Sequence, residues 1–167
     1  MKLIYVHHGH RAKTYPPSQN DGLTEIGEKD TLLTAEILKE LKQKANPVAI
    51  YTSQFFRCTK TAENINKYLN LPIIIDKRLD EFRSVENETW TDLLNRVIAC
   101  IKDAVDKHDN DSTIIFVTSG VNLSGFICFA YNIEPNENIP FPLVPSCSPI
   151  GFDYDKTGNA DMPKYFK

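Results

Sequence analysis

The residues of this sequence that could do chemistry fall in four short clusters. The clusters read HHGHR at residues 7–11, SQFFR at 53–57, LDE at 79–81 and TSG at 118–120. Imidazole is a nucleophile and a base, guanidinium holds anionic oxygens in pairs, and a sheltered carboxyl donates protons. One site built from all four clusters would combine anion binding with nucleophilic and acid–base chemistry.

A metal site is another way to use the histidines. If the first strand continued, His8 and His10 would share one side, and imidazole suits zinc or nickel. However, Gly9 indicates a turn, and no carboxylate or cysteine at a fixed spacing completes a ligand set with His7. We therefore predict neither a metal nor a cofactor.

Alternating apolar segments predict the elements that would position the clusters. Short β-type runs occupy residues 2–7, 48–52, 72–75, 113–118 and 148–154. Helices are predicted over residues 25–45, 55–68, 90–106 and 121–131. Thr89, with Asp92 three residues later, resembles a capping box at the start of the third helix.

Strands that alternate with helices imply a single-domain α/β fold over residues 1–167, in which 155–167 form a polar tail. We expect a doubly wound, mostly parallel sheet with helices on both faces. Ligands bind such sheets beyond the carboxyl ends of the strands. Three of the clusters follow strands directly and Glu81 lies in a loop after a fourth, which predicts one shared pocket.

Composition narrows the class of partner. The 167 residues are 41% hydrophobic and 25% charged, with a net charge of −3, which is typical of a soluble globular chain without a nucleic-acid partner. The apolar stretch at residues 123–133 is too short to span a bilayer, and residues 1–8 lack a signal-peptide pattern. The four scattered cysteines indicate reduced, buried thiols, so we expect a cytoplasmic protein without membrane contact. No feature of the sequence indicates its oligomeric state.

Five motifs, in order along the chain, resemble those of the histidine phosphatase superfamily, which includes the cofactor-dependent phosphoglycerate mutases. VHHGHR at residues 6–11 is similar to its RHG motif, and LTEIG at 23–27 to its LTxxG motif. Residues 51–63 are similar to its SxxxR…TAE segment, LDE at 79–81 to its catalytic-acid loop, and VTSG at 117–120 to its SHG or THG strand end. The resemblance implies a phosphoglycerate mutase-like fold.

The resemblance also implies roles for individual residues. His8 would attack phosphorus to form a phosphohistidine, Arg57 would hold phosphate oxygens, and Glu81 would protonate the leaving oxygen. Gly120 would belong to the phosphate-binding strand end. The chain is shorter than the mutases, which favours hydrolysis in an open pocket. The expected ligand is a small phosphorylated molecule or inorganic phosphate.

Two positions depart from the family pattern. His7 stands where the family has the arginine of the RHG motif. Ser119 stands where the family has the histidine of the SHG or THG strand end. Removing one oxyanion donor typically costs about 10²–10³ in turnover. Arg11 is either a substitute cation or a solvated loop charge, while a protonated His7 and the Ser119 hydroxyl are weaker substitutes.

Two hypotheses therefore stay open. The protein is a phosphomonoesterase weakened at these two positions, or it is a catalytically inactive phosphatase-fold protein. An inactive protein would bind a phosphorylated ligand or a protein partner.

Overall fold

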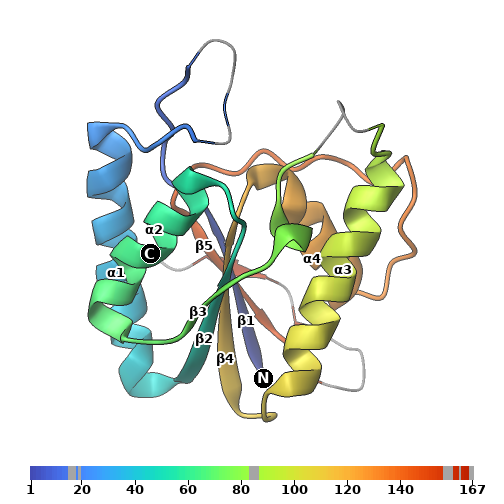
Figure 1. The fold of residues 1–167 in the computed structure, drawn as a ribbon. Coiled ribbons are helices and arrows are strands. Elements are labelled where there is room, and N and C mark those ends of the chain that lie inside the picture. The colour runs from blue at the N-terminus through green and yellow to red at the C-terminus, as the bar shows by residue number, and fades with distance from the viewer. Residues whose placement is uncertain (15–17, 19, 83–86, 156–159, 162, 166–167) are drawn as a thin grey trace.

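Strands and helices alternate along the chain, as predicted (Figure 1). The computed structural model describes residues 1–14, 18, 20–82, 87–155, 160–161 and 163–165. The first half contains β1 (Lys2–His7), α1 (Glu25–Lys44), β2 (Asn46–Thr52), α2 (Phe56–Leu69), β3 (Ile73–Ile75) and the 3-10 helix η1 (Lys77–Leu79). The second half contains α3 (Trp90–Lys107), β4 (Ser112–Thr118), the 3-10 helix η3 (Gly120–Asn122), α4 (Leu123–Ala130), β5 (Pro149–Asp153) and β6 (Lys164–Tyr165).

Within the described residues the strands form one sheet in the order β3-β2-β4-β1-β5-β6. The pairs β1–β4, β4–β2 and β2–β3 are parallel, and β5 runs antiparallel to β1. The predicted mostly parallel sheet is therefore confirmed. The short strand β6 pairs with β5 and lies in the segment that the sequence analysis treats as a polar tail.

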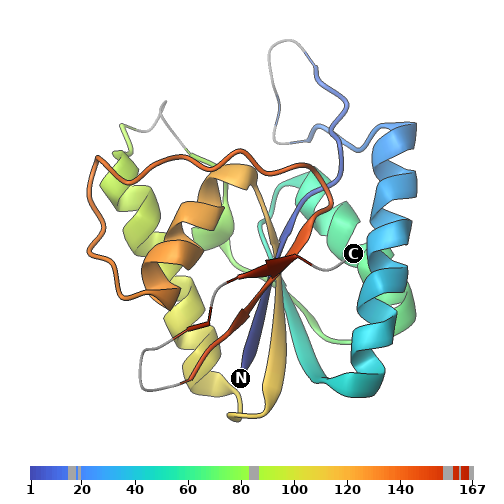
Figure 2. The ribbon, with the colours of Figure 1, turned by 180° about the vertical axis from the view of Figure 1, so that it is seen from behind.

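Helices cover both faces of the sheet, which confirms the doubly wound prediction. Helices α1 and α2 lie on one face, and α3 and α4 on the other (Figures 1 and 2). Strand β1 shows why two faces are needed: Leu3 and Tyr5 pack with α3 and α4, whereas Ile4 and Val6 pack with α1 and α2. A central parallel strand buried on both sides is apolar at every position, as in these four residues. None of the helices in the described stretches is long and apolar enough to cross a membrane.

Helix α3 begins at the predicted capping box. The hydroxyl of Thr89 accepts a hydrogen bond from the Asp92 backbone N–H at 3.1 Å, and the Asp92 carboxylate accepts one from the Thr89 N–H at 3.0 Å. Such a cap is worth about 1 kcal/mol. It fixes where the helix begins, and hence which of its residues face the sheet.

The carboxyl ends of β1, β4 and β2 meet at one edge of the sheet. His7 is in register with Thr118, and Thr52 with Val117. The backbone N–H of His8 donates to Thr118 O at 2.9 Å, which continues the pairing one residue beyond the strand. The clusters after the three strands are therefore neighbours, as the sequence predicts.

Two glycines allow the loop after β1 to lie against the start of α1. A Cβ built on Gly27 would lie 2.9 Å from the His10 backbone nitrogen, and one on Gly9 would lie 3.0 Å from Gly27 O. The Gly9 N–H donates to Thr61 Oγ1 at 3.0 Å, which ties the loop to α2 as well. These contacts hold the backbone on both sides of His8.

We predict that Gly27→Ala destabilises the protein by roughly 1–3 kcal/mol, because the added methyl group overlaps backbone that cannot yield. Urea denaturation followed by circular dichroism measures the change. Gly22→Ala is the matched control, because its Cβ would meet only Phe56 Cε1 at an ordinary 3.4 Å. Equal unfolding midpoints for the two variants would contradict the close approach.

Candidate active site

The imidazole of His8 is held as a neutral ring with one unprotonated nitrogen. Its Nδ1 lies 2.8 Å from Gly9 O, and its Nε2 lies 3.1 Å from Arg57 Nε. Because the Arg57 N–H can only donate, Nε2 accepts, and Nδ1 carries the proton that it donates to Gly9. Burial, with smaller contributions from His7, Arg57 and Arg11, lowers the pKa of His8 to about 3. At neutral pH the ring therefore keeps a lone pair on Nε2, which nucleophilic attack requires.

Arg57 joins His8 to Glu81. It is the second residue of α2, and its side chain is only 1% exposed. Its Nη2 forms an ion pair with a Glu81 carboxylate oxygen, and its guanidinium carbon lies 4.7 Å from the centre of the Phe55 ring. A buried cation needs such partners. Arg57 thus contacts both of the other side chains that the sequence analysis assigns to chemistry.

His7 lies beside the nucleophile candidate but carries no charge at neutral pH. Its Nδ1 donates to Val144 O at 3.0 Å, and its ring centre lies 4.6 Å from that of His8. Burial lowers the pKa of His7. Protonation at His7, considered above as a source of positive charge, is therefore harder than for an exposed histidine. A Cβ on Gly120 would lie 3.2 Å from His7 Cε1, so the absence of a side chain at Gly120 leaves room for the His7 ring.

Ser119 presents a buried hydroxyl with unused hydrogen-bonding capacity. The residue is 2% exposed, and its Oγ has no hydrogen-bond partner among the described residues. Its backbone carbonyl accepts from the Tyr5 hydroxyl at 3.0 Å, which fixes the turn after β4. An unpaired buried hydroxyl costs free energy unless a ligand or water satisfies it.

Arg11 and His10 follow Gly9 in the loop after β1 and lie in different surroundings. Arg11 pairs with Leu23 in an isolated antiparallel bridge, and its charge is one of the contributions, after burial, to the lowered pKa of His8. His10 is exposed, and its Nδ1 lies 3.0 Å from Thr24 Oγ1. In the described part of the chain no group of three or more His, Cys, Asp or Glu residues is arranged to hold a metal ion.

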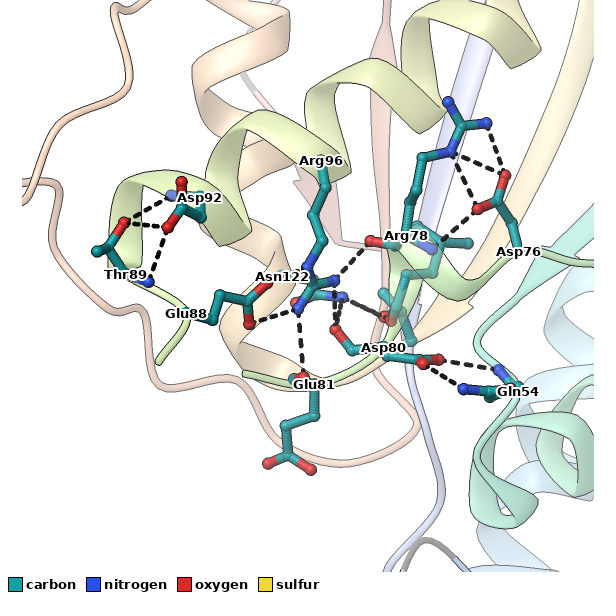
Figure 3. Close-up of polar contacts among 12 residues, drawn as sticks. Gln54, Asp76, Arg78, Asp80, Glu81, Glu88, Thr89, Asp92, Arg96 and Asn122 are labelled. Atoms are coloured by element: carbon teal, nitrogen blue, oxygen red, sulfur yellow. Dashed lines mark hydrogen bonds and ion pairs between the residues drawn. The ribbon is translucent and has the colours of Figure 1, made fainter. Parts of the chain in front are cut away.

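The sequence analysis did not single out the residues that hold the Glu81 loop. The buried Asp80 carboxylate accepts from Ser53 Oγ at 2.7 Å and from the Gln54 N–H at 3.1 Å, which joins this loop to the start of α2. Asn122 Nδ2 donates to Leu79 O at 2.7 Å (Figure 3). Asp80 adjoins Glu81 in the LDE motif and could have been found from that position. Asn122 could not, because its partner is a backbone carbonyl 43 residues away.

Aromatic residues lie near the loop that carries Glu81. Phe82 is 38% exposed, and its ring centre lies 6.3 Å from that of Trp90 in an edge-on arrangement. Trp90 Nε1 donates to Ile139 O at 3.0 Å, so Trp90 anchors the segment before β5. Tyr15, also considered as a lining residue, lies outside the described residues.

Comparison with known proteins agrees with this arrangement. Residues 6–86 match the histidine phosphatase superfamily (branch 1), and a search of curated proteins finds no match. YhfR of Bacillus stearothermophilus is 23% identical with a TM-score of 0.74, over 96% of this chain and 94% of that one. The protein histidine phosphatase SixA complexed with tungstate is 18% identical with a TM-score of 0.73, over 99% and 97%.

A mycobacterial glucosyl-3-phosphoglycerate phosphatase in complex with VO3 is 15% identical with a TM-score of 0.76, over 98% of this chain and 96% of that one. At these identities the likeness concerns the fold. The family match spans His8, Arg57 and Glu81, and the fold is shared over nearly the whole chain. By these findings the chain resembles the histidine phosphatase superfamily over residues 6–86 and has a phosphoglycerate mutase-like fold.

Proposed function

We propose that the protein is a phosphomonoester hydrolase that acts through a phosphohistidine at His8. The observation that carries this proposal is the neutral, buried imidazole, whose Nε2 lone pair faces Arg57. The Glu81 carboxylate on the other side of Arg57 supplies the second group that the reaction needs. Complexes of similarly folded proteins with VO3 and tungstate support a phosphate-like ligand.

The proposed reaction has two steps. When the phosphate binds Arg57 in place of the Glu81 carboxylate, that carboxylate takes up a proton from solvent. His8 Nε2 then attacks phosphorus, the ester P–O bond breaks, and the Glu81 carboxyl donates this proton to the leaving oxygen. Water then attacks the phosphohistidine, the P–N bond breaks, and its proton passes to Glu81 as inorganic phosphate leaves. A phosphate dianion near Arg57 would draw its N–H groups away from Nε2, so that substrate binding frees the lone pair.

The remaining phosphate contacts are proposed to be His7, Arg11, Ser119 and Gly120. Ser119 offers a buried, unpartnered hydroxyl, and Arg11 lies within electrostatic reach of His8. Neutral His7 supplies less charge than an arginine would, so turnover is expected to be low. Each weakened contact costs about 10²–10³ in rate, and losses within one constellation do not simply add. The four free, buried cysteines support a cytoplasmic location.

A second candidate function is binding of a phosphorylated ligand or protein partner without turnover. The observation that favours it is that Arg57 bonds both Nε2 of His8 and the Glu81 carboxylate, so the groups proposed to react satisfy one another. The uncharged His7 adds no second cation beside them. Oxyanion binding without any phosphoenzyme would support this function.

We predict that the wild type hydrolyses para-nitrophenyl phosphate slowly and that His8→Ala abolishes hydrolysis. His10→Ala is the matched control, because His10 is exposed and bonds Thr24 rather than Arg57. Mass spectrometry after a denaturing quench at alkaline pH, where the acid-labile P–N bond survives, should find an adduct of about 80 Da on the peptide containing His8, the mass that one phosphoryl group adds. A silent wild type that still binds vanadate would favour the second candidate.

We predict that Arg11→Gln weakens vanadate binding about tenfold or more, because a charge-assisted hydrogen bond is worth about 1.5–3 kcal/mol. Isothermal titration calorimetry measures the affinity. Lys13→Gln removes an exposed positive charge two residues away and serves as the control. Equal affinities for the two variants would make Arg11 a surface charge only.

We predict no loss of nucleophile between pH 8 and pH 4. The pKa of His8 is depressed, so the neutral form persists until the pH falls toward about 3. An ordinary histidine would begin to protonate near pH 6.5. The test is kcat/KM for para-nitrophenyl phosphate, corrected for ionisation of the substrate. A tenfold fall for each pH unit below 6.5 would contradict the assignment.

A further inference from the structure

Arg96 of α3 contacts the backbone of the segment that carries Glu81. Its Nη1 donates to Arg78 O and to Asp80 O, both at 2.7 Å. Its Nη2 donates to Glu81 O at 3.2 Å. One guanidinium therefore donates hydrogen bonds to three of the carbonyls of residues 78–81.

The remaining N–H groups of Arg96 bind Glu88. Nε pairs with one Glu88 carboxylate oxygen, and Nη2 lies 3.0 Å from the other. The Arg96 and Glu88 side chains are only 17% and 11% exposed, so the charge is sheltered and paired. All five donors of the guanidinium are used. A lysine has three donors and no planar fork, so it could not make this set.

The two ends of residue Glu81 point in different directions. Figure 3 shows its carbonyl toward Arg96 and its carboxylate on the far side. That carboxylate pairs with Arg57. Arg96 therefore reaches the reacting group only through the backbone of Glu81.

We propose that Arg96 is a positioning residue that sets the place of the Glu81 carboxyl relative to His8, which rests on the proposed phosphatase function. A proton donor must lie about 2.6–3.2 Å from the oxygen it protonates. A displacement of about 1 Å can cost about 10²-fold in rate. Of the described residues after η1, Asp80, Glu81 and Phe82 belong to no helix or strand, so side-chain donors supply the restraint that backbone pairing would otherwise give.

The test compares two substrates that differ in their need for an acid. Para-nitrophenolate is a good leaving group and needs no proton. The alkoxide of an alkyl phosphate is a poor leaving group and must be protonated as it departs. Arg96→Lys should lower kcat/KM for the alkyl phosphate by up to about 10²-fold and leave kcat/KM for the aryl phosphate within about threefold. The parameter is kcat/KM because it reports the steps up to departure of the alcohol, whereas the later hydrolysis of the phosphohistidine also uses Glu81 and is common to both substrates.

Two further variants separate positioning from general support of the fold. Glu81→Gln should show the same dependence on leaving group, and adding Arg96→Lys to it should cost nothing more, because both act through one carboxyl. Arg78→Lys is the matched control, because the Arg78 guanidinium pairs with Asp76 and Asp103 and not with the Glu81 carbonyl. The inference would be overturned if kcat/KM fell equally for both substrates, or if the losses from Arg96→Lys and Glu81→Gln added in the double variant.

A second measurement does not depend on turnover. Hydrogen exchange in the peptide containing residues 77–82 should be faster in Arg96→Lys than in the wild type, and unchanged exchange would overturn the inference. A wild type inactive on both substrates would refute the proposed function alone. In that case the exchange result decides whether Arg96 holds the Glu81 segment.

Discussion

The buried positive charge of Arg57 is the constraint on which the rest of the site depends. A charge that is 99% removed from water is costly unless several groups compensate it. His8 Nε2, the Glu81 carboxylate and the Phe55 ring do so. Burial is the main reason why His8 stays neutral, and Arg57 adds to it, because a protonated imidazole would place a second positive charge against the first.

The sheet satisfies this constraint by bringing three strand ends to one edge. The Glu81 segment is not part of the sheet and is held in place by hydrogen bonds. Gln54, just before α2, donates to the Asp80 carboxylate of that segment. Asn122 of η3 and Arg96 of α3 donate to backbone carbonyls of the segment. Most of these bonds end on backbone carbonyls, so they fix where the segment runs and leave the Glu81 side chain free to face Arg57. The fold and the site are thus held together by one set of polar contacts.

The fold was predictable because apolar strands alternate with amphipathic helices, and the clusters after three strands had to be neighbours. The contacts of His8, Arg57 and Glu81 follow from that placement together with the family resemblance. Arg96 and Asn122 escaped notice because their partners are carbonyls, which every residue carries, so no local pattern marks them. The lowered pKa of His7 was also out of reach, since it depends on burial beneath the segment around Val144. Strand β6 is two residues long and has no periodicity to detect.

The same constraint suggests how ligand binding and activation are coupled in the proposed function. Without ligand, Arg57 is shared between a neutral lone pair and a carboxylate that is about one-third exposed. A phosphate dianion is a stronger acceptor for guanidinium than a neutral imidazole, because charge-assisted hydrogen bonds are roughly twice as strong as neutral ones. The ligand would therefore displace His8 from Arg57, and Nε2 would become available when phosphorus arrives. An arginine at position 7 would help to neutralise the phosphate charge, whereas the buried, neutral His7 leaves most of that charge to Arg57.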